Sequence, residues 1–389
     1  MEEEIKKEAI RRYLFEGESP KSVYTSLNRS KKWFFKWLKR YQSGASDWYK
    51  ERSRSPHTKP SEISEMAKEI IVTTRTRLES EPYAQIGVSA IKWEMQKLGV
   101  PLPSDSTVKR TLRREGLIKK TGYAPKGVEY PYFTDPLCCN NIHQMDLVGP
   151  RYIKGDGRFY SLNVIDLFSH LVYLETQRTK EDDQIALSLI RCWKVMGFPD
   201  FLQIDNELSF RGSNRYPRSL GLVLRLCLHY GVQPVFIPVG EPWRNGIIEH
   251  FNDTYDRKFF HRQWFSSYAM LKRQSKNFQT FHNRHHRYSC LKGKTPLEVI
   301  ASEEFRPITL GPNTRLPEIN NIPDGNISLI RFIRSDRRLD IFGEKFEVSK
   351  DLAYSYLRAM IVTEIHMLQV YLGDELVEAF EYHLPPEIS

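Results

Sequence analysis

Residues 143–249 and the helix that follows decide the fold of this chain through four segments: HQMDLVGP (143–150), YSLNVIDLFSHLVYLE (160–175), FLQIDNELSF (201–210) and PVGEPWRNGIIEHFNDTYDRKFF (238–260). The second segment is rich in β-branched and aromatic residues and is typical of two strands joined by a turn at residues 168–170. The third is a short apolar run, and the fourth is a Pro- and Gly-rich loop that leads into a helix. The pattern predicts strands that form a sheet, with a helix beside it.

Three carboxylates stand out in these segments because a sheet could aim them at one point. Asp146 and Asp205 are expected at the ends of strands, and Glu249 is expected on the helix. Cleaving or joining a phosphodiester needs an activated water or 3′-hydroxyl and charge stabilisation at phosphorus, and two divalent cations supply both. Mg²⁺ prefers oxygen ligands, so a few carboxylates can hold it. Taken alone, Glu249 would more often be an ordinary acid on a helix surface.

Taken in order, the segments resemble the integrase core shared by retroviral integrases and many bacterial insertion-sequence transposases. MDLVG matches the family's pattern around its first Asp, YSLNVIDLFSH the hairpin that follows it, DNELSF the pattern around the second Asp, and PWRNGIIEHFNDTYDRKF the helix that carries the Glu. A fifth piece, FHNRHHRYSCLKGKTPLEVI at 281–300, resembles the end of that domain. The resemblance implies a catalytic core at residues 142–302 with an RNase H-like α/β fold, a mixed five-stranded sheet with flanking helices. It also implies an Asp-Asp-Glu (DDE) triad formed by Asp146, Asp205 and Glu249.

Two features depart from the family's pattern. The family usually has Asp-Asn-Gly at the second Asp, whereas this chain has Asp205-Asn206-Glu207. Glu207 either alters the turn or joins the ligand set, and the sequence leaves both readings open. The 43 residues between Asp205 and Glu249 are more than is usual in the family. We assign the extra length to a surface loop at residues 209–219, where an insertion costs little.

The resemblance implies a DNA transposase that acts by metal-dependent DNA cleavage and strand transfer, that is, by transposition and DNA integration. Asp146 would ligate both of two Mg²⁺ ions in each active site, with Mn²⁺ as a substitute, and Asp205 and Glu249 would complete one site each. The implied partners are double-stranded DNA, as terminal inverted repeats and as target, and at least one further copy of the chain, since two ends must be joined. One alternative is a domesticated, sequence-specific DNA-binding regulator without catalysis. Another is a plain RNase H-like nuclease.

The whole chain of 389 residues is long enough for several domains, and its 40% hydrophobic residues suffice for packed cores. No apolar run reaches the length of a transmembrane helix, and the acidic start MEEEIKKEAI is unlike a signal peptide. The five cysteines include no CxxC pair, which favours reduced thiols over disulfides or a zinc site. We therefore expect a cytoplasmic protein, bacterial by the resemblance.

The net charge of +10 is confined to the N-terminal third of the chain. Residues 1–120 contain 26 Lys and Arg against 16 Asp and Glu, whereas the remaining residues contain 32 of each kind. A localised positive field is typical of proteins that bind the phosphate backbone of nucleic acids. A merely solvated basic surface is the alternative.

Residues 1–45 have the rhythm of a helix-turn-helix module, with helices expected at 2–15, 21–27 and 31–42. The third helix would enter the major groove, with Trp33, Phe34 and Leu38 on its core face. Its candidate DNA contacts are Lys31, Lys32, Lys36, Lys39 and Arg40. A basic linker follows at 46–60. The alternative to DNA binding is a small helical bundle with a charged exterior.

Residues 61–120 repeat the rhythm, with helices expected at 61–78, 87–98 and 104–114. Ser61 is the expected N-cap of the first helix, and Ser104 or Ser106 that of the third. In the third helix Val108 and Leu112 would face inward. The candidate DNA contacts of this second helix-turn-helix are Lys109, Arg110, Arg113 and Arg114. An irregular connector at 121–141 leads to the core.

Further candidate DNA contacts lie around the predicted triad. Trp243, Arg244 and Asn245 precede the Glu249 helix, where related proteins position DNA ends, and Lys258 lies on roughly the same helix face as Glu249. From residue 323 to residue 389 the hydrophobic period changes to two, with short strands separated by turns. This predicts a small antiparallel β-barrel that contacts DNA or another subunit.

Overall fold

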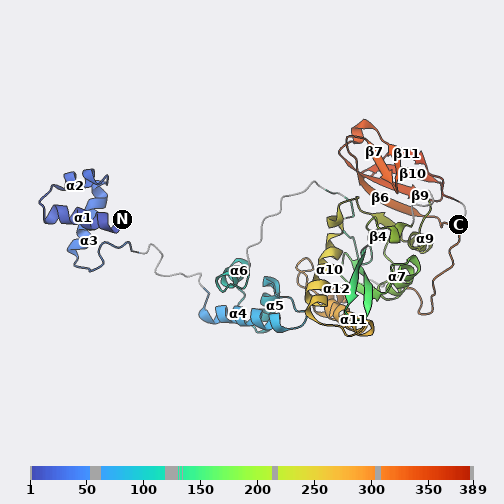
Figure 1. The fold of residues 1–389 in the computed structure, drawn as a ribbon, viewed down its shortest axis with the longest axis horizontal. Helices are drawn as coiled ribbons and strands as arrows, with labels where there is room; N and C mark the ends of the chain where they lie inside the picture. The colour runs from blue at the N-terminus through green and yellow to red at the C-terminus, as the bar shows by residue number, and fades with distance from the viewer. Residues whose placement is uncertain are drawn as a thin grey trace. The chain divides into compact units, whose positions relative to one another are not determined.

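The computed structural model of the protein describes residues 2–52, 63–118, 130, 132–133, 135–212, 218–302 and 308–385. The chain divides into two compact units, residues 1–63 and 64–389 (Figure 1). The linker, the connector and the 209–219 loop expected from the sequence each lie partly outside the described residues. None of the described helices has the length and apolarity needed to cross a membrane.

The first unit contains three helices, α1 (Glu2–Leu14), α2 (Pro20–Ser26) and α3 (Lys31–Gln42), close to the expected bounds. Ser19 and Ser30 cap α2 and α3, since each hydroxyl accepts a hydrogen bond from the backbone N–H three residues later. The apolar faces of the three helices meet in one small core, made of Ala9, Ile10, Val23, Phe34 and Leu38.

The core face of α3 differs from the prediction at one position. Trp37 is fully buried, whereas Trp33 is only partly buried. The ring of Trp37 lies within 4.6 Å of three cationic groups, those of Lys6, Lys36 and Arg40. Cations are attracted to the face of an indole ring, so this Trp sits beneath a basic surface as well as in the core.

Three more helices open the second unit, α4 (Glu65–Ser80), α5 (Val88–Lys97) and α6 (Asp105–Arg114). The N-cap of α4 is Ser64, which accepts from Ala67 N, and not Ser61, which lies outside the described residues. Ser104 caps α6, as predicted. Val108 and Leu112 of α6 are buried, also as predicted.

Five strands form the centre of the second unit, β1 (Ile142–Ile153), β2 (Gly157–Asp166), β3 (Val172–Gln177), β4 (Phe201–Ile204) and β5 (Gln233–Phe236). They lie in the order β5-β4-β1-β2-β3. The pairs β1–β2 and β2–β3 are antiparallel, and β1–β4 and β4–β5 are parallel. The mixed character of the predicted sheet is confirmed, but the prediction of five strands is wrong, because these five belong to a larger sheet that the C-terminal strands extend.

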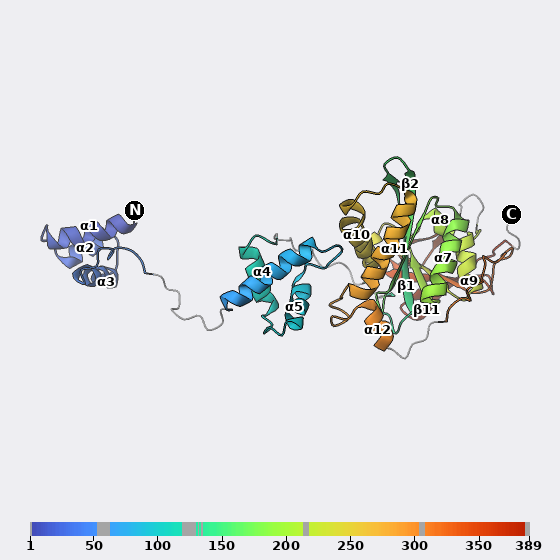
Figure 2. The ribbon, with the colours of Figure 1, turned by 90° about the horizontal axis from the view of Figure 1, so that it is seen from below.

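Helices cover both faces of this sheet, as Figure 2 shows. On one face lie α7 (Asp182–Met196) and α9 (Leu222–His229), whose buried residues share one hydrophobic core with Leu162 and Val164 of β2. On the other lie α10 (Gly246–Lys258) and α11 (Tyr268–His285), which pack against Phe159 and Ile165 of the same strand. Alternate residues of β2 therefore serve opposite cores, as the pleat of a strand requires. Shorter elements complete the core: α8 (Leu208–Arg211), η1 (Pro242–Asn245), η2 (Phe260–Arg262) and α12 (Pro296–Ser302).

The C-terminal strands correct one expectation from the sequence. They are β6 (Asn326–Phe332), β7 (Arg338–Ile341), β8 (Glu344–Glu347), β9 (Tyr356–Val362), β10 (Met367–Leu372) and β11 (Glu375–Glu381), with a short helix η3 (Lys350–Leu352). They do not form a separate closed barrel, because β6 pairs in parallel with β5 and makes one nine-stranded sheet, β11-β10-β9-β6-β5-β4-β1-β2-β3. The edge of β5 offers backbone groups that need partners, and β6 supplies them. β7 and β8 form a separate hairpin.

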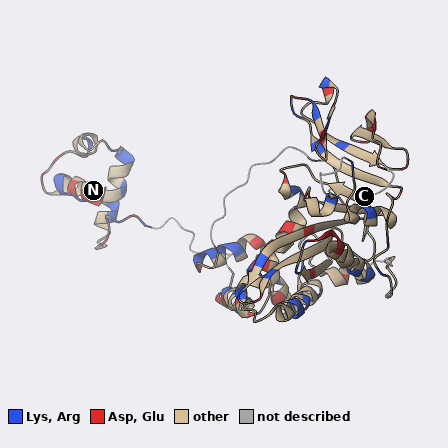
Figure 3. Cartoon of the chain, turned by 45° about the vertical axis from the view of Figure 1, so that its right-hand side comes forward, with Lys and Arg blue, Asp and Glu red and all other residues tan. Residues whose placement is uncertain are grey.

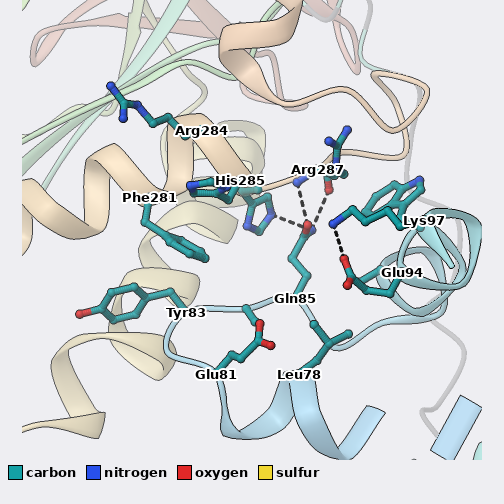
Figure 4. A pocket seen from close by; sticks show the side chains of 14 residues that line it. Leu78, Glu81, Tyr83, Gln85, Glu94, Lys97, Phe281, Arg284, His285 and Arg287 are labelled. Carbon is teal, nitrogen blue, oxygen red and sulfur yellow. Dashed lines mark hydrogen bonds and ion pairs between the residues drawn. The ribbon is translucent and has the colours of Figure 1, made fainter. Parts of the chain in front are cut away.

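A clamp of side chains joins the segment after α4 to the end of α11. Gln85 Oε1 accepts a hydrogen bond from Arg287 N at 2.7 Å, and Gln85 Nε2 donates to Arg287 O at 2.7 Å. Figure 4 shows this amide reaching the backbone of Arg287. Gln85 Nε2 also lies 3.0 Å from His286 Nε2. Nearby, Tyr83 packs edge-on against Phe278 with ring centroids 5.3 Å apart. We call Tyr83 and Gln85 the clamp.

We expect Gln85→Ala to destabilise the second unit by about 2 kcal/mol, because it leaves the N–H and C=O of Arg287 without their partner. Urea unfolding measures the change. Gln96→Ala is the matched control, since Gln96 is an exposed residue of α5. Equal stability of the two variants would show that the hydrogen bonds of Gln85 contribute nothing to stability.

Candidate active site

Asp146 is the fifth residue of β1, in the middle of the strand rather than at its end. The register of its pairing with β2 shifts between Val148 and Arg151. The pairing then resumes, so the strand continues to Ile153. The Asp146 carboxylate is largely buried and accepts a hydrogen bond from Asn252 Nδ2 of α10 at 2.6 Å. The two elements that carry the predicted first and third acids are therefore in direct contact.

A chain of polar side chains fixes α10 on the sheet. Ser161 Oγ donates to Asn163 Oδ1 at 2.8 Å, and Asn163 Nδ2 donates to Asn252 Oδ1 at 2.7 Å, so that Asn252 can donate to Asp146. At the start of α10, Gln144 Oε1 accepts from Ile248 N at 3.0 Å. Sequence reasoning missed these residues. The sequence does contain a signal for them, because Gln144 and Asn163 are amide residues within largely apolar strands. Buried polar groups require partners, so such residues are expected to bind other polar side chains.

Asp205 follows β4 directly, as predicted. Its Oδ1 accepts from Glu207 N at 3.0 Å, which closes a tight turn. Glu207 has φ −64° and ψ 140°, a conformation open to any residue, so the turn does not need the family's glycine. The Glu207 carboxylate accepts from Lys180 Nζ at 3.1 Å and from Ser209 Oγ at 3.0 Å.

Asp146 and Asp205 each lie two residues beyond Gln144 and Gln203, which are paired in the parallel strands β1 and β4, so the two acids are neighbours. Burial, and then the negative charge of Asp205, raise the pKa of Asp146 to about 6. Burial also raises the pKa of Asp205; the hydrogen bond from Glu207 N opposes this shift, and the charge of the Glu207 carboxylate adds to it. The pKa of Glu249 is raised by burial and then by Asp253, and neither of the two Asp residues contributes to it. The structure thus brings two of the three predicted acids together.

Glu249 lies on the first turn of α10, three residues before Asn252. Residues three apart share a helix face, so Glu249 lies one turn along the face that meets Asp146. Within the described ranges, no three side chains of His, Cys, Asp or Glu are grouped closely enough to hold a metal ion. Asn252, and not Glu249, makes the contact to Asp146 in this structure.

The pair of Asp residues fits a divalent cation in its chemistry. Both carboxylates are partly buried, each has a raised pKa, and no described basic side chain donates a hydrogen bond to either. Two carboxylates held together without a counter-charge repel each other, and a hard cation with oxygen ligands would relieve that repulsion. Asp146 and Asp205 would hold such an ion.

We expect Asp146→Asn to stabilise the metal-free protein by about 2 kcal/mol at pH 7. A carboxyl whose folded pKa is raised loses stability as pH rises from its ordinary pKa of 3.8 through about 6, so the full penalty applies at pH 7. Urea unfolding in EDTA measures the difference, and added Mg²⁺ should stabilise only the wild type.

Asp156→Asn is the matched control, with the opposite sign. The Asp156 carboxylate accepts from Tyr268 N and from Arg178, which lowers the pKa of Asp156. Its removal should therefore destabilise the protein. A metal-free Asp146→Asn protein that is less stable than the wild type would show that the two Asp residues do not repel each other.

The predicted DNA contacts on α3 and α6 are largely exposed, and Lys and Arg are blue in Figure 3. On α6, Lys109, Arg110, Arg113 and Arg114 are all exposed, opposite the buried face of the helix. On α3, Lys31, Lys32 and Lys39 are exposed as well. Lys36 also forms an ion pair with Glu51 at 3.3 Å, and Arg40 donates to Lys50 O at 2.9 Å, so these two also have structural contacts.

The predicted DNA contacts near Glu249 differ in their accessibility. The side chain of Trp243 is 60% exposed. Arg244 donates to Glu241 at 2.9 Å and to Tyr356 Oη at 3.1 Å. Arg244 therefore links η1 to the C-terminal strand β9.

The remaining two of these residues make internal contacts. Asn245 is buried and accepts from Gln203 Nε2 at 3.0 Å. The amine of Lys258 donates to Ala84 O beside the clamp, and burial lowers the pKa of Lys258 to about 8. Asn245 and Lys258 therefore have structural roles in this structure, which helical spacing alone did not indicate.

Residues 230–296 match the family model described as an integrase core domain. This segment contains β5, η1, α10 and α11, and with them Glu249 and Asn252. The resemblance indicated by the sequence motifs is confirmed at the level of this core. It is the same segment that the polar chain from Ser161 to Asn252 holds against the sheet.

Solved structures that are similar to this chain include two retroviral integrase catalytic core domains. One is that of HTLV-2 with magnesium (16% identity, TM-score 0.31, covering 42% of this chain and 99% of that one). The other is that of BIV (17%, 0.31, 42% and 95%). A third is the simian T-cell lymphotropic virus intasome with the PP2A regulatory subunit B56 gamma (14%, 0.37, 77% and 95%).

Proposed function

Since residues 230–296 form an integrase core segment, we propose that this chain is a DNA transposase of the insertion-sequence type. It would bind the terminal inverted repeats of a transposon, cleave DNA there and join the ends to a target. The observation that carries the proposal is that Asp146 and Asp205 are neighbours and that Asp146 contacts α10. This helix belongs to the matched segment and carries Glu249.

In this mechanism the three acids would be the ligands of two Mg²⁺ ions. Asp146 would ligate both ions, and Asp205 and Glu249 one each. When bound, the ions supply an activated water or 3′-hydroxyl and stabilise the charge on the leaving oxygen. Asn252 holds the Asp146 carboxylate in place, and the turn from Asp205 to Glu207 holds that of Asp205.

The two groups of three helices would supply recognition of the ends. The exposed basic residues of α3 and α6 would contact phosphates and base edges, and the exposed Trp243 would contact DNA near the active site. Binding by many Lys and Arg residues should weaken steeply with salt, because phosphate contacts release counterions. Joining two ends requires at least two copies of the chain.

A strand-transfer assay tests the proposal. The wild-type protein is incubated in Mg²⁺ or Mn²⁺ with donor oligonucleotides taken from the inverted repeats that flank its own gene, and joined products are resolved on a gel. Joined products support the transposase. Specific binding of these ends without any product would instead support a DNA-binding regulator.

A further inference from the structure

A buried arginine of the C-terminal strands reaches the candidate active site. Arg331 lies on β6 and is only 6% exposed. Its guanidinium donates to Asp340 O at 2.9 Å, to Ile330 O at 2.9 Å and to Ile237 O at 3.2 Å. The remaining nitrogen, Nη2, donates to Asn206 Oδ1 at 2.9 Å.

An apolar residue at this position could be buried at a lower cost in free energy than an arginine. Leu329, on the same face of β6, and Ile333, directly after the strand, are both fully buried. All its hydrogen-bond partners are neutral oxygens, and burial lowers the pKa of Arg331 to about 10, although the charge of Asp340 opposes this shift. A buried charge without a paired carboxylate is costly, so packing alone does not account for this residue.

The contact to Asn206 connects Arg331 to the turn that carries Asp205. Asn206 Nδ2 donates to Ile237 O at 2.7 Å, and Arg331 Nη1 donates to the same oxygen. Asn206 is thereby held on both sides of its side-chain amide, between the end of β5 and β6. Its chain neighbours are Asp205 and Glu207, which are joined by the hydrogen bond that closes the turn.

We propose that Arg331 is a positioning residue for Asp205, acting through Asn206, and that the C-terminal strands are thereby part of the metal site. The inference rests on the proposed function, because it gives Asp205 its role as a ligand. An arginine fits the task because its planar fork can bind three or four oxygens in fixed directions at once. A lysine at this position could not span the same set of acceptors.

The test is Mn²⁺ binding to the full-length protein by isothermal titration calorimetry. We expect Arg331→Lys and Asn206→Ala each to raise the Mn²⁺ dissociation constant about 10- to 100-fold, the range typical of residues that orient metal ligands. Asn206→Ala provides a second route if Arg331→Lys does not fold. Arg358→Lys is the matched control, because Arg358 of β9 stacks on Tyr371 and has no described contact with the Asp205 turn.

Strand transfer gives a second readout that separates the two proposals. If Arg331 positions Asp205, the Mn²⁺ concentration for half-maximal joining rises in both variants and excess Mn²⁺ restores much of the activity. Wild-type protein that binds Mn²⁺ but joins no DNA would overturn the proposed function. The Mn²⁺ affinities of the variants, measured by calorimetry, would then still decide whether Arg331 positions Asp205. A folded Asn206→Ala protein with wild-type Mn²⁺ affinity would overturn the positioning role.

Discussion

Strand transfer by Asp205→Asn is expected to fall by about 10³-fold, and by a similar factor in Asp146→Asn and Glu249→Gln. Each change removes a negative oxygen ligand while keeping the size of the side chain. Binding of end DNA should stay the same or become tighter, because a negative charge near the phosphates is lost. The assay is joined product per unit time at saturating Mg²⁺, with end binding measured separately.

Asp253→Asn is the matched control for Glu249→Gln. Asp253 lies four residues later on α10, and its exposed carboxylate pairs with Arg257 at 3.2 Å. It should retain wild-type strand transfer. If Glu249→Gln also remains active, the third acid is a different residue, and Glu207 is the next candidate because its charge already acts on both Asp146 and Asp205.

The second unit is expected to lose several kcal/mol of stability when the pH falls from 7 to 4, because it buries neutral histidines. Burial lowers the pKa of His143 and His170 to about 4 and that of His286 to about 3. The nearby Asp166 carboxylate opposes this effect at His143 and His170 but does not outweigh it.

The sign follows from the unfolded chain, where histidine has its ordinary pKa of about 6.5. Below that pH the unfolded state binds protons that the folded state does not bind. The free energy of unfolding is therefore at its full value above about pH 6.5 and decreases as the pH falls towards 4. One such histidine accounts for about 3 kcal/mol at pH 4, a large share of the stability of a typical domain.

Urea unfolding between pH 7 and pH 4 measures this loss, and His143→Gln isolates one site. The glutamine can keep the contact that His143 Nε2 makes with Asn140 Oδ1, but it cannot titrate. The wild type should lose about 1.4 kcal/mol per pH unit more than the variant within the window. His383→Gln, at an exposed site, should leave the pH dependence unchanged. Identical curves for the wild type and His143→Gln would contradict the expectation.

The sequence by itself determined the elements and the candidate acids. A run rich in β-branched and aromatic residues located the strands that flank the turn at residues 168–170, and Ser104 before a basic amphipathic run located α6. Asp146, Asp205 and Glu249 were recognised because they stand in ordered motifs. These features are local, since the period, the cap and the motif each depend on residues a few positions apart.

Only the tertiary structure decided which distant segments meet. Alternating strands at the C-terminus predicted a barrel, but alternation does not specify a partner, and the edge of β5 took β6 as its neighbour. That pairing brought Arg331 to Asn206, and the packing of α10 brought Asn252, rather than Glu249, to Asp146. Such contacts depend on edges and polar groups that require partners once buried, and those requirements arise only when the chain has folded.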